Sequence, residues 1–122
     1  MAAPNILSAT SIYGKTVGAA LGTTLTTSLL ENASGSNKVL KINSIIVANV
    51  DGTSAADVTV SFYNGSTDFH LAKTVTVPAD STLIVLGKDS PIYLEENHSI
   101  RGGASANSDL EIVISYEDLT DD

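Results

Sequence analysis

Most of the chain after residue 22 alternates short apolar runs with turn residues. The longest run, KVLKINSIIVANV, ends at Val50, and its odd positions begin polar but become apolar at Ile45 and Val47. Because successive side chains of a strand point to opposite faces, this run predicts a strand with two apolar faces. A second chain or a further layer would cover the face of Ile45 and Val47. The other apolar face consists of Leu40, Ile42, Ile46, Ala48 and Val50, interrupted by Ser44.

Further segments also have the composition of strands. In DVTVSFY, Val58, Val60 and Phe62 are expected to point inward, and the turn pair Asn64-Gly65 follows because both residue types tolerate positive φ. In the last strand, DLEIVISYE, we expect Leu110, Ile112, Ile114 and Tyr116 to point inward and Glu111 outward. The remaining strand candidates are TTLTTSLL (23–30), HLAKTVTVP (70–78), STLIVLG (81–87), PIYL (91–94) and HSIR (98–101).

The segment before these strands is different. Residues 1–21 are rich in Gly, Ala and Ser and weakly patterned, which predicts an N-terminal arm or a poorly regular edge segment, ordered mainly when something binds it. Residues 22–118 form the predicted domain, and 119–122 an acidic tail. No apolar helical periodicity persists for three turns. We therefore predict an all-β fold, an antiparallel two-sheet β-sandwich of seven or eight strands with jelly-roll or immunoglobulin-like connectivity.

Composition narrows the possible functions. The chain of 122 residues is 43% hydrophobic and 16% charged, as expected of one folded domain. It has no cysteine, so thiolate metal sites and cysteine nucleophiles are excluded. The net charge of −8 argues against binding to nucleic acid or to an anionic membrane. The N-terminus has no basic region followed by an apolar core, and we expect no secretory signal.

The residues suited to catalysis are few and scattered. His70 and His98 lack partners at metal-ligand spacing, so we interpret both as surface or edge histidines. A triad could be written from Ser66, Asp68 and His70, but no nucleophile elbow frames the serine. We therefore predict that the protein is not an enzyme, and we expect no cofactor and no metal site.

Other polar motifs have structural interpretations. Asp51, in VDGTSAAD, is favoured as a turn residue, with a bound divalent cation as the alternative. Gly102-Gly103 is interpreted as a loop before the last strand. Arg101, the only arginine, either pairs with a carboxylate or anchors an interface. The six aromatic residues are too few and too far inside strands to predict a stacking platform.

Several of these segments together resemble a family of virion proteins. The VANVDGT turn, the VPADSTLIVL strand entry, IYLEENHSI and the closing SANSDLE and SYE segments are similar to small virion proteins of tailed bacteriophages, many from phages of marine and photosynthetic bacteria. The resemblance covers roughly residues 36–118, and the opening MAAPNI also fits it. The pair in RGGASAN is less typical. These are structural motifs, so they indicate a family more than a role.

The resemblance implies a non-enzymatic component of the virion, made in the bacterial host cytoplasm. The first hypothesis is a capsid decoration (cement) protein on the particle surface, which binds the major capsid protein and forms a homo-oligomer such as a trimer. The alternatives are a neck, tail or fibre-associated virion protein, or a soluble module that binds glycan or a cation. We expect an arm over residues 2–21 to dock on the shell, so that deletion of residues 2–20 would leave the sandwich folded. The expected interface residues are Ala2, Pro4, Ile6, Ile12, Tyr13, Ile45 and Val47, the last two being equally well explained as a second core layer.

Overall fold

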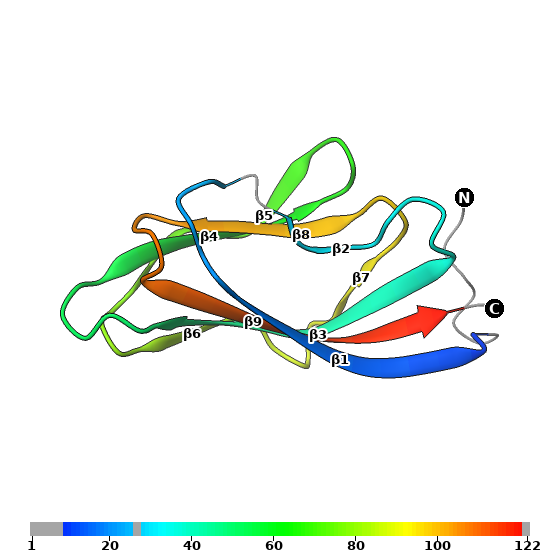
Figure 1. Cartoon of the computed structure of the whole chain (residues 1–122), viewed down its shortest axis with the longest axis horizontal. Coiled ribbons are helices and arrows are strands. Elements are labelled where there is room, and N and C mark those ends of the chain that lie inside the picture. Colours follow the sequence, from blue (N-terminus) through cyan, green and yellow to red (C-terminus); the bar gives the residue numbers. More distant parts are fainter. Residues whose placement is uncertain (1–8, 26–27, 121–122) are drawn as a thin grey trace.

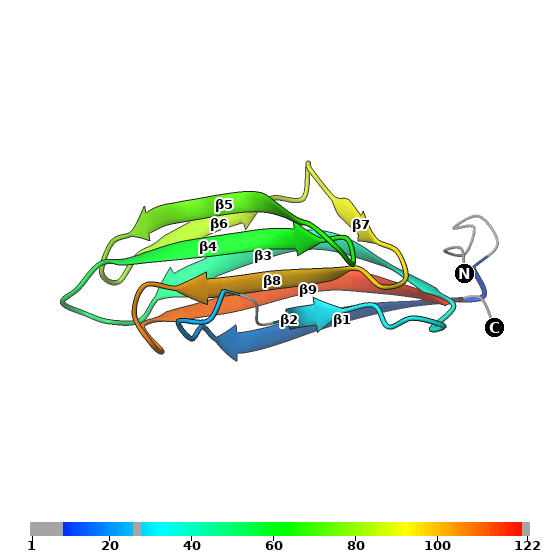
Figure 2. The same ribbon diagram turned by 90° about the horizontal axis from the view of Figure 1, so that it is seen from above.

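The computed structural model describes residues 9–25 and 28–120. These residues form nine strands in two antiparallel sheets that pack face to face, which confirms the predicted β-sandwich (Figure 1). In Figure 2 the strands of both sheets run along the long axis of the molecule. The strands are β1 (Ser11–Ala20), β2 (Ser28–Glu31), β3 (Lys38–Asn49), β4 (Ala56–Tyr63), β5 (Asp68–Val77), β6 (Thr82–Leu86), β7 (Ile92–Leu94), β8 (Ser99–Ala104) and β9 (Leu110–Thr120).

The order of the strands resolves the connectivity. The first sheet, here called sheet A, has the order β1-β9-β3-β6, with β7 also pairing with β3. The second, sheet B, has the order β2-β8-β4-β5. With β7 set aside, the chain passes to the opposite sheet at every connection except the β4–β5 hairpin. This is the strand order of a jelly roll, one of the two connectivities expected from the sequence.

The core lies between the two sheets. Val58, Val60 and Val77 project into it from sheet B, and Ile112 and Ile114 from sheet A, all as the alternation of their strands predicts. Leu21, which follows β1, is also buried there. Complete burial of an aliphatic side chain of this size contributes about 1.5–3 kcal/mol. Burial of alternate residues on the strands thus supplies the main stabilisation of the fold.

A β-bulge in β3 corrects the predicted faces of that strand. The register of β3 against β9 shifts between Ile42 and Ser44, which leaves Asn43 as an extra residue. Since one extra residue turns all later side chains over, Ile45 and Val47 point into the core and are 0% exposed. The prediction that they form an intersubunit contact is therefore wrong, and the alternative of a second core layer is right only in that both are core residues, because they lie in the one core between the two sheets. Ile46 and Ala48, expected on the core face, lie on the outer side of sheet A.

The N-terminal segment also differs from the prediction. Residues 11–20, expected to be an arm or a poorly regular edge segment, form the regular edge strand β1, which pairs along its whole length with β9. The Gly, Ala and Ser residues of this segment obscured the alternation of apolar and polar residues that identifies a strand. At the edge of a sheet, however, a strand with small side chains can still pair with its one neighbour. The acidic tail was expected from residue 119, whereas β9 continues to Thr120. Residues 121–122 lie outside the described part of the chain.

The glycine pair lies within a strand. Gly102 and Gly103 belong to β8, so the interpretation as a loop is wrong. A Cβ at Gly102 would lie 3.0 Å from Leu29 Cδ1, and one at Gly103 would lie 2.6 Å from Leu25 Cδ2 and 3.0 Å from the Thr24 carbonyl oxygen. Gly103 thus allows the segment after β1 to cross β8 at close range, and Gly102 allows close packing against Leu29 of β2.

Candidate functional site

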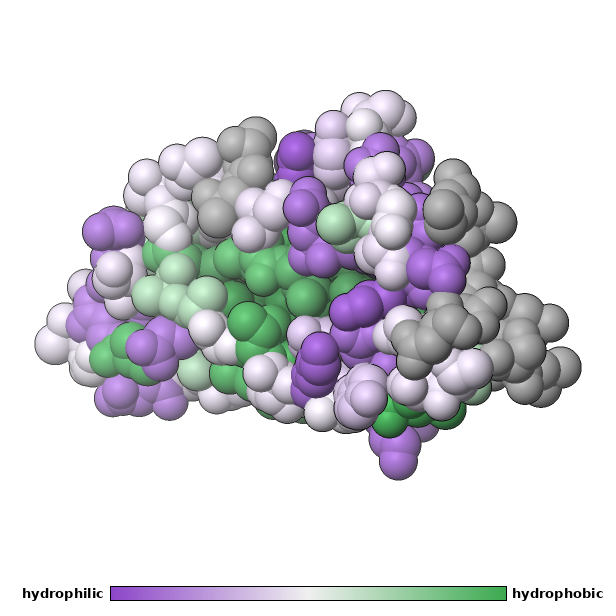
Figure 3. Space-filling view, turned by 45° about the vertical axis from the view of Figure 1, so that its right-hand side comes forward, coloured by the Kyte–Doolittle hydropathy of each residue, from purple (hydrophilic) through white to green (hydrophobic). Residues whose placement is uncertain are grey.

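The side of the sandwich between edge strands β1 and β2 is open. Figure 3 shows apolar surface in a hollow on this side, with charged and polar surface beside it. Val17 and Ala19 of β1 and Leu29 and Leu30 of β2 are half-buried and pack against the core from the two edges. A pocket of about 230 Å³ lies between β1, β2, β3 and β9. Its lining comprises Lys15, Leu30, Glu31, Asn32, Ala33, Ser36, Lys38, Leu40, Tyr116 and Asp118.

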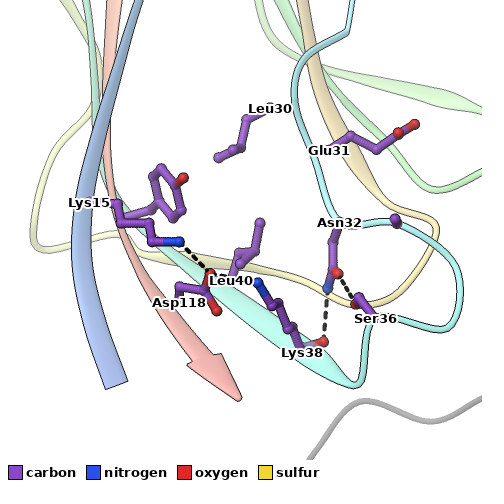
Figure 4. Close-up of a pocket in the computed structure, with 10 residues that line it drawn as sticks. Lys15, Leu30, Glu31, Asn32, Ser36, Lys38, Leu40 and Asp118 are labelled. Carbon is purple, nitrogen blue, oxygen red and sulfur yellow. Dashed lines mark hydrogen bonds and ion pairs between the residues drawn. The ribbon is translucent and has the colours of Figure 1, made fainter. Parts of the chain in front are cut away.

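A buried carboxylate is the centre of this pocket (Figure 4). Asp118 is 3% exposed, and its Oδ2 accepts hydrogen bonds from Lys15 Nζ at 3.0 Å and from Lys38 Nζ at 3.1 Å. Thr120 Oγ1 donates to its other oxygen at 3.1 Å. The two ion pairs join β1 and β3 to β9, which lies between them.

The charges of this cluster determine what it can do. Burial raises the pKa of Asp118, but the hydrogen bonds from Lys15, Lys38 and Thr120 outweigh burial and bring it below its ordinary value. The hydrogen bond to Asp118 likewise raises the pKa of Lys15. At neutral pH the carboxylate is therefore ionised and the amine protonated. Because the two lysines and the carboxylate are paired with one another, the cluster holds β1, β9 and β3 together.

A row of apolar side chains crosses the outer face of sheet A. Ile46 of β3 lies opposite Val113 of β9 on one side and Ile84 of β6 on the other. Ile84 is 68% exposed and Val113 39% exposed. Gly18 of β1 lies beyond Val113 and adds no side chain there. Antiparallel sheets that face water usually present polar residues outward, so an apolar row across three strands is suited to contact with another surface.

The predicted interface residues fall into three groups. Ile12 and Tyr13 lie on β1 and are 59% and 56% exposed. Ile45 and Val47 are in the core, as described above. Ala2, Pro4 and Ile6 lie outside the described residues. The structure therefore leaves Ile12 and Tyr13 accessible for contact with a partner and removes Ile45 and Val47 from the candidates.

The residues of the hypothetical triad make other contacts. Ser66 Oγ donates to Asn64 Oδ1 at 3.2 Å, within the turn predicted at Asn64-Gly65, where Gly65 has φ of 95°. Asp68 accepts hydrogen bonds from Ser61 Oγ at 2.8 Å and from Arg101. Asp68 is thus occupied by residues other than Ser66, and the alternative of a triad gains no support.

The two histidines and the arginine pack against neighbouring strands. His98 Nδ1 accepts the Glu95 N–H at 3.1 Å, and its ring meets Phe62 edge-on. His70 is exposed on β5. Arg101 pairs with Asp68 at 3.2 Å and stacks on Tyr63 at 3.4 Å. Of the two roles considered for Arg101, pairing with a carboxylate is confirmed.

Asp51 stabilises a turn, as favoured from the sequence. Its Oδ1 accepts hydrogen bonds from the N–H and the hydroxyl of Thr53, both at 3.0 Å. These hydrogen bonds lower the pKa of Asp51. Within residues 9–25 and 28–120, no group of three or more His, Asp or Glu side chains is arranged to hold a metal ion.

Aromatic side chains form a second pocket, which the sequence did not predict. Phe69 and Tyr93, expected to be internal to their strands, are exposed at about half of their surface. They lie at a pocket of about 200 Å³ that is also lined by Phe62, His70, Leu71 and Ile92. The pocket joins β5 of sheet B to β7 of sheet A, a pairing of distant segments that the sequence gives no means to foresee.

Two further features, the Lys15–Asp118 pair and the outer row, were missed in the sequence because they also join segments that are distant in the chain. Lys15 and Asp118 are separated by 103 positions, and the pair forms only because β1 and β9 are neighbours. The outer row unites Ile46, Ile84 and Val113 from three strands. The sequence did contain a partial signal of the outer row, because STLIVLG, which includes Ile84, is apolar on both faces.

Comparison with known proteins gave no assignment. No protein-family model matches the chain, and no curated protein matches it. No helix in the described part of the chain is long and apolar enough to cross a membrane.

Proposed function

We propose that this protein is a non-enzymatic structural component of a bacteriophage virion, a capsid decoration protein that binds the outside of the shell. The apolar row of Ile46, Val113 and Ile84 on the outer face of sheet A carries the proposal. Exposed apolar rows on a sheet favour burial against a second protein surface. The resemblance of the strand and turn segments to small virion proteins is the reason for proposing that this second surface belongs to a bacteriophage particle.

The proposed mechanism is stabilisation by mass action. A protein that binds the assembled shell, but not its separated subunits, shifts the equilibrium toward the assembled state. The jelly-roll fold is compatible with this role because it recurs in viral capsid proteins, but it also occurs in lectins. The fold therefore supports the proposal less than the outer row does.

The proposal is tested by counting how many copies of the protein bind to each phage particle. Purified protein is added to phage shells that lack it, and bound copies are counted by cryo-electron microscopy and quantitative mass spectrometry. Decoration predicts hundreds of copies in a lattice over the shell. A ring of about a dozen copies at one vertex would instead identify a neck or tail protein.

A charge in the outer row tests the surface itself. Ile84→Asp places a carboxylate on the exposed row and should weaken shell binding at least tenfold, because burial of an unpaired charge is unfavourable. The matched control is Ser66→Asp, which adds the same charge in the exposed loop between β4 and β5, away from sheet A. Equal binding of Ile84→Asp and wild type would exclude sheet A as the docking face.

The aromatic pocket favours a second candidate function. Phe69 and Tyr93 offer exposed rings of the kind that stack on sugars, at a pocket of about 200 Å³. Titration of a glycan library into ¹⁵N-labelled protein would detect binding as shifts of the β5 and β7 amides. Shifts confined to these strands, with no occupancy of shells, would favour the glycan-binding module over decoration.

A further inference from the structure

Strand β1 is the longest regular edge among the described strands. Its ten residues pair with β9 in unbroken register, and no described strand pairs with its other side. The edge strands β2, β6 and β7 have four, five and three residues. β5 is as long as β1, but its pairing with β4 is interrupted by register shifts, and Thr74 within it has φ of 53°. Short or bulged strands are the usual protection of a sheet edge, and β1 has neither feature.

The direction of the free backbone groups of β1 follows from one hydrogen bond. Leu21 N–H donates to the Leu110 carbonyl oxygen at 2.8 Å, in the same register as the β1–β9 ladder. In an antiparallel ladder, every second residue directs its N–H and C=O to the same neighbour. Odd-numbered residues of β1 therefore bond to β9. The even-numbered residues 12, 14, 16, 18 and 20 direct their N–H and C=O groups to the open edge.

The side chains of β1 do not block the approach of another strand to this edge. Lys15 is the only charged residue of β1, and it turns inward to Asp118 at 3.0 Å. Gly14, Gly18 and Ala20 add almost no bulk on the outer side, and a Cβ at Gly14 would meet no atom within 4 Å. The backbone of β1 is therefore open to a further strand.

The distribution of charge indicates which strand can pair there. All 14 acidic residues follow residue 30, whereas the first 30 residues carry no Asp or Glu and one lysine. Two copies of a chain with net charge −8 repel one another over most of their surfaces. β1 itself contributes one lysine and no negative charge, so a second copy of β1 placed at this edge adds no repulsion between carboxylates of the two strands.

We propose that two copies of this chain pair through β1 in antiparallel orientation about a two-fold axis, which makes one continuous sheet from both copies of sheet A. Such an interface is isologous, with one surface used twice. Pairing must join the even-numbered residues of both strands, and one register joins all five. That register places Thr16 opposite Thr16 of the second copy, Gly14 opposite Gly18 and Ile12 opposite Ala20. It also places Lys15 opposite Val17, which keeps the two lysines from meeting directly.

A single substitution tests the pairing. Thr16→Pro removes the N–H that points to the open edge and leaves the N–H groups that bond to β9 intact. Since residue 16 would exchange two hydrogen bonds with its symmetry mate, dimer dissociation should increase by about tenfold or more. Thr16→Val is the matched control, because it keeps the N–H and the side-chain shape. Sedimentation equilibrium over about 1–500 µM gives the dissociation constants.

The expected result is a wild-type and Thr16→Val dimer, of twice the 12.6 kDa chain mass, and a Thr16→Pro monomer with an unchanged circular dichroism spectrum. A wild-type monomer over the whole range overturns the proposal, as does a dimer or trimer that Thr16→Pro leaves intact. Both measurements use purified protein without particles. They are therefore independent of the proposed decoration role.

A crosslink provides a second measurement in case Thr16→Pro fails to fold. The chain has no cysteine, so Thr16→Cys introduces one thiol. Hydrogen-bonded antiparallel pairs have Cα atoms about 5.5 Å apart, within the range of a disulfide. Mild oxidation should link Thr16→Cys into dimers several-fold faster than Ser66→Cys, in an exposed loop. Equal rates for the two variants would contradict the two-fold pairing.

Discussion

Buried polar side chains fix the loops of this sandwich. Asn32 Nδ2 donates to the carbonyl oxygens of Lys38 and Leu94, and Asn49 Nδ2 donates to those of Ser54 and Val77. The carboxylate of Glu96 accepts the N–H groups of Gly35 and Asn37. Since an unpaired buried polar group costs about 1–3 kcal/mol, these residues specify where each loop lies. In the sequence they are indistinguishable from ordinary loop residues.

Asp118 makes stability depend on pH in a defined direction. Its pKa is lower in the folded state than the ordinary value of 3.8, so its contribution is present above about pH 4 and is lost as pH falls further. Asp118→Asn should reduce the free energy of unfolding at pH 7 by about 1–2 kcal/mol, since the neutral amide weakens the bonds to both lysines. Urea denaturation of both proteins between pH 2 and pH 7 measures the difference in their free energies of unfolding.

The comparison with wild type isolates the carboxylate. The two proteins should converge in stability only when the pH falls below the lowered folded-state pKa of Asp118, where the carboxyl is protonated in both states. A constant difference across the whole range would mean that the side-chain shape, and not its charge, is responsible.

Gly103 is required by the segment that crosses over it. Gly103→Ala puts a Cβ 2.6 Å from Leu25 and 3.0 Å from the backbone oxygen of Thr24, so that segment must move. We expect the free energy of unfolding to fall by about 1–3 kcal/mol, as in other overpacked sites. Gly14→Ala is the control, because its Cβ enters open space and should change stability by less than about 0.5 kcal/mol. Equal urea midpoints for both variants would contradict this role of Gly103.

At the level of the element, alternation predicted most strands, and the exceptions have local causes. The pattern of DLEIVISYE predicted the buried Leu110, Ile112 and Ile114 because β9 has no irregularity there relative to β1. In β3 the same reasoning failed beyond Asn43, since a bulge inverts the faces. Ile45 and Ile46 are chemically alike, so the sequence could not show which of the two faces inward.

The candidate site was less predictable than the strands. The exposure of Ile12 and Tyr13 agrees with a surface role, but the Lys15–Asp118–Lys38 cluster depends on β1, β9 and β3 being neighbours. Strand order is set by how the sheets pack as a whole, and a period-two pattern contains no information about it. Sites assembled across strands are therefore those that sequence reasoning missed.

For the whole molecule, the jelly-roll order makes the first strand part of the folding unit. β1 pairs with β9, which in turn pairs with the central strand β3, and Leu21 directly after β1 is in the core. Deletion of residues 2–20 would expose the edge of β9 and remove Val17 and Ala19 from the core. The sequence alone predicted a folded truncation, whereas the structure predicts the reverse.

Differential scanning calorimetry distinguishes the two expectations. Small domains have a net stability of about 5–15 kcal/mol, and removal of a ten-residue strand costs a large share of it. We expect the truncated chain to lose its cooperative unfolding transition or to unfold at least about 10 °C below wild type. In a domain of about this size, a loss of a few kcal/mol in the free energy of unfolding lowers the melting temperature by about that amount. Full-length protein carrying Gly14→Ala keeps β1 and serves as the reference. A truncated chain with the wild-type transition would return residues 11–20 to the role of an arm, and would also remove the basis for pairing of two copies through β1.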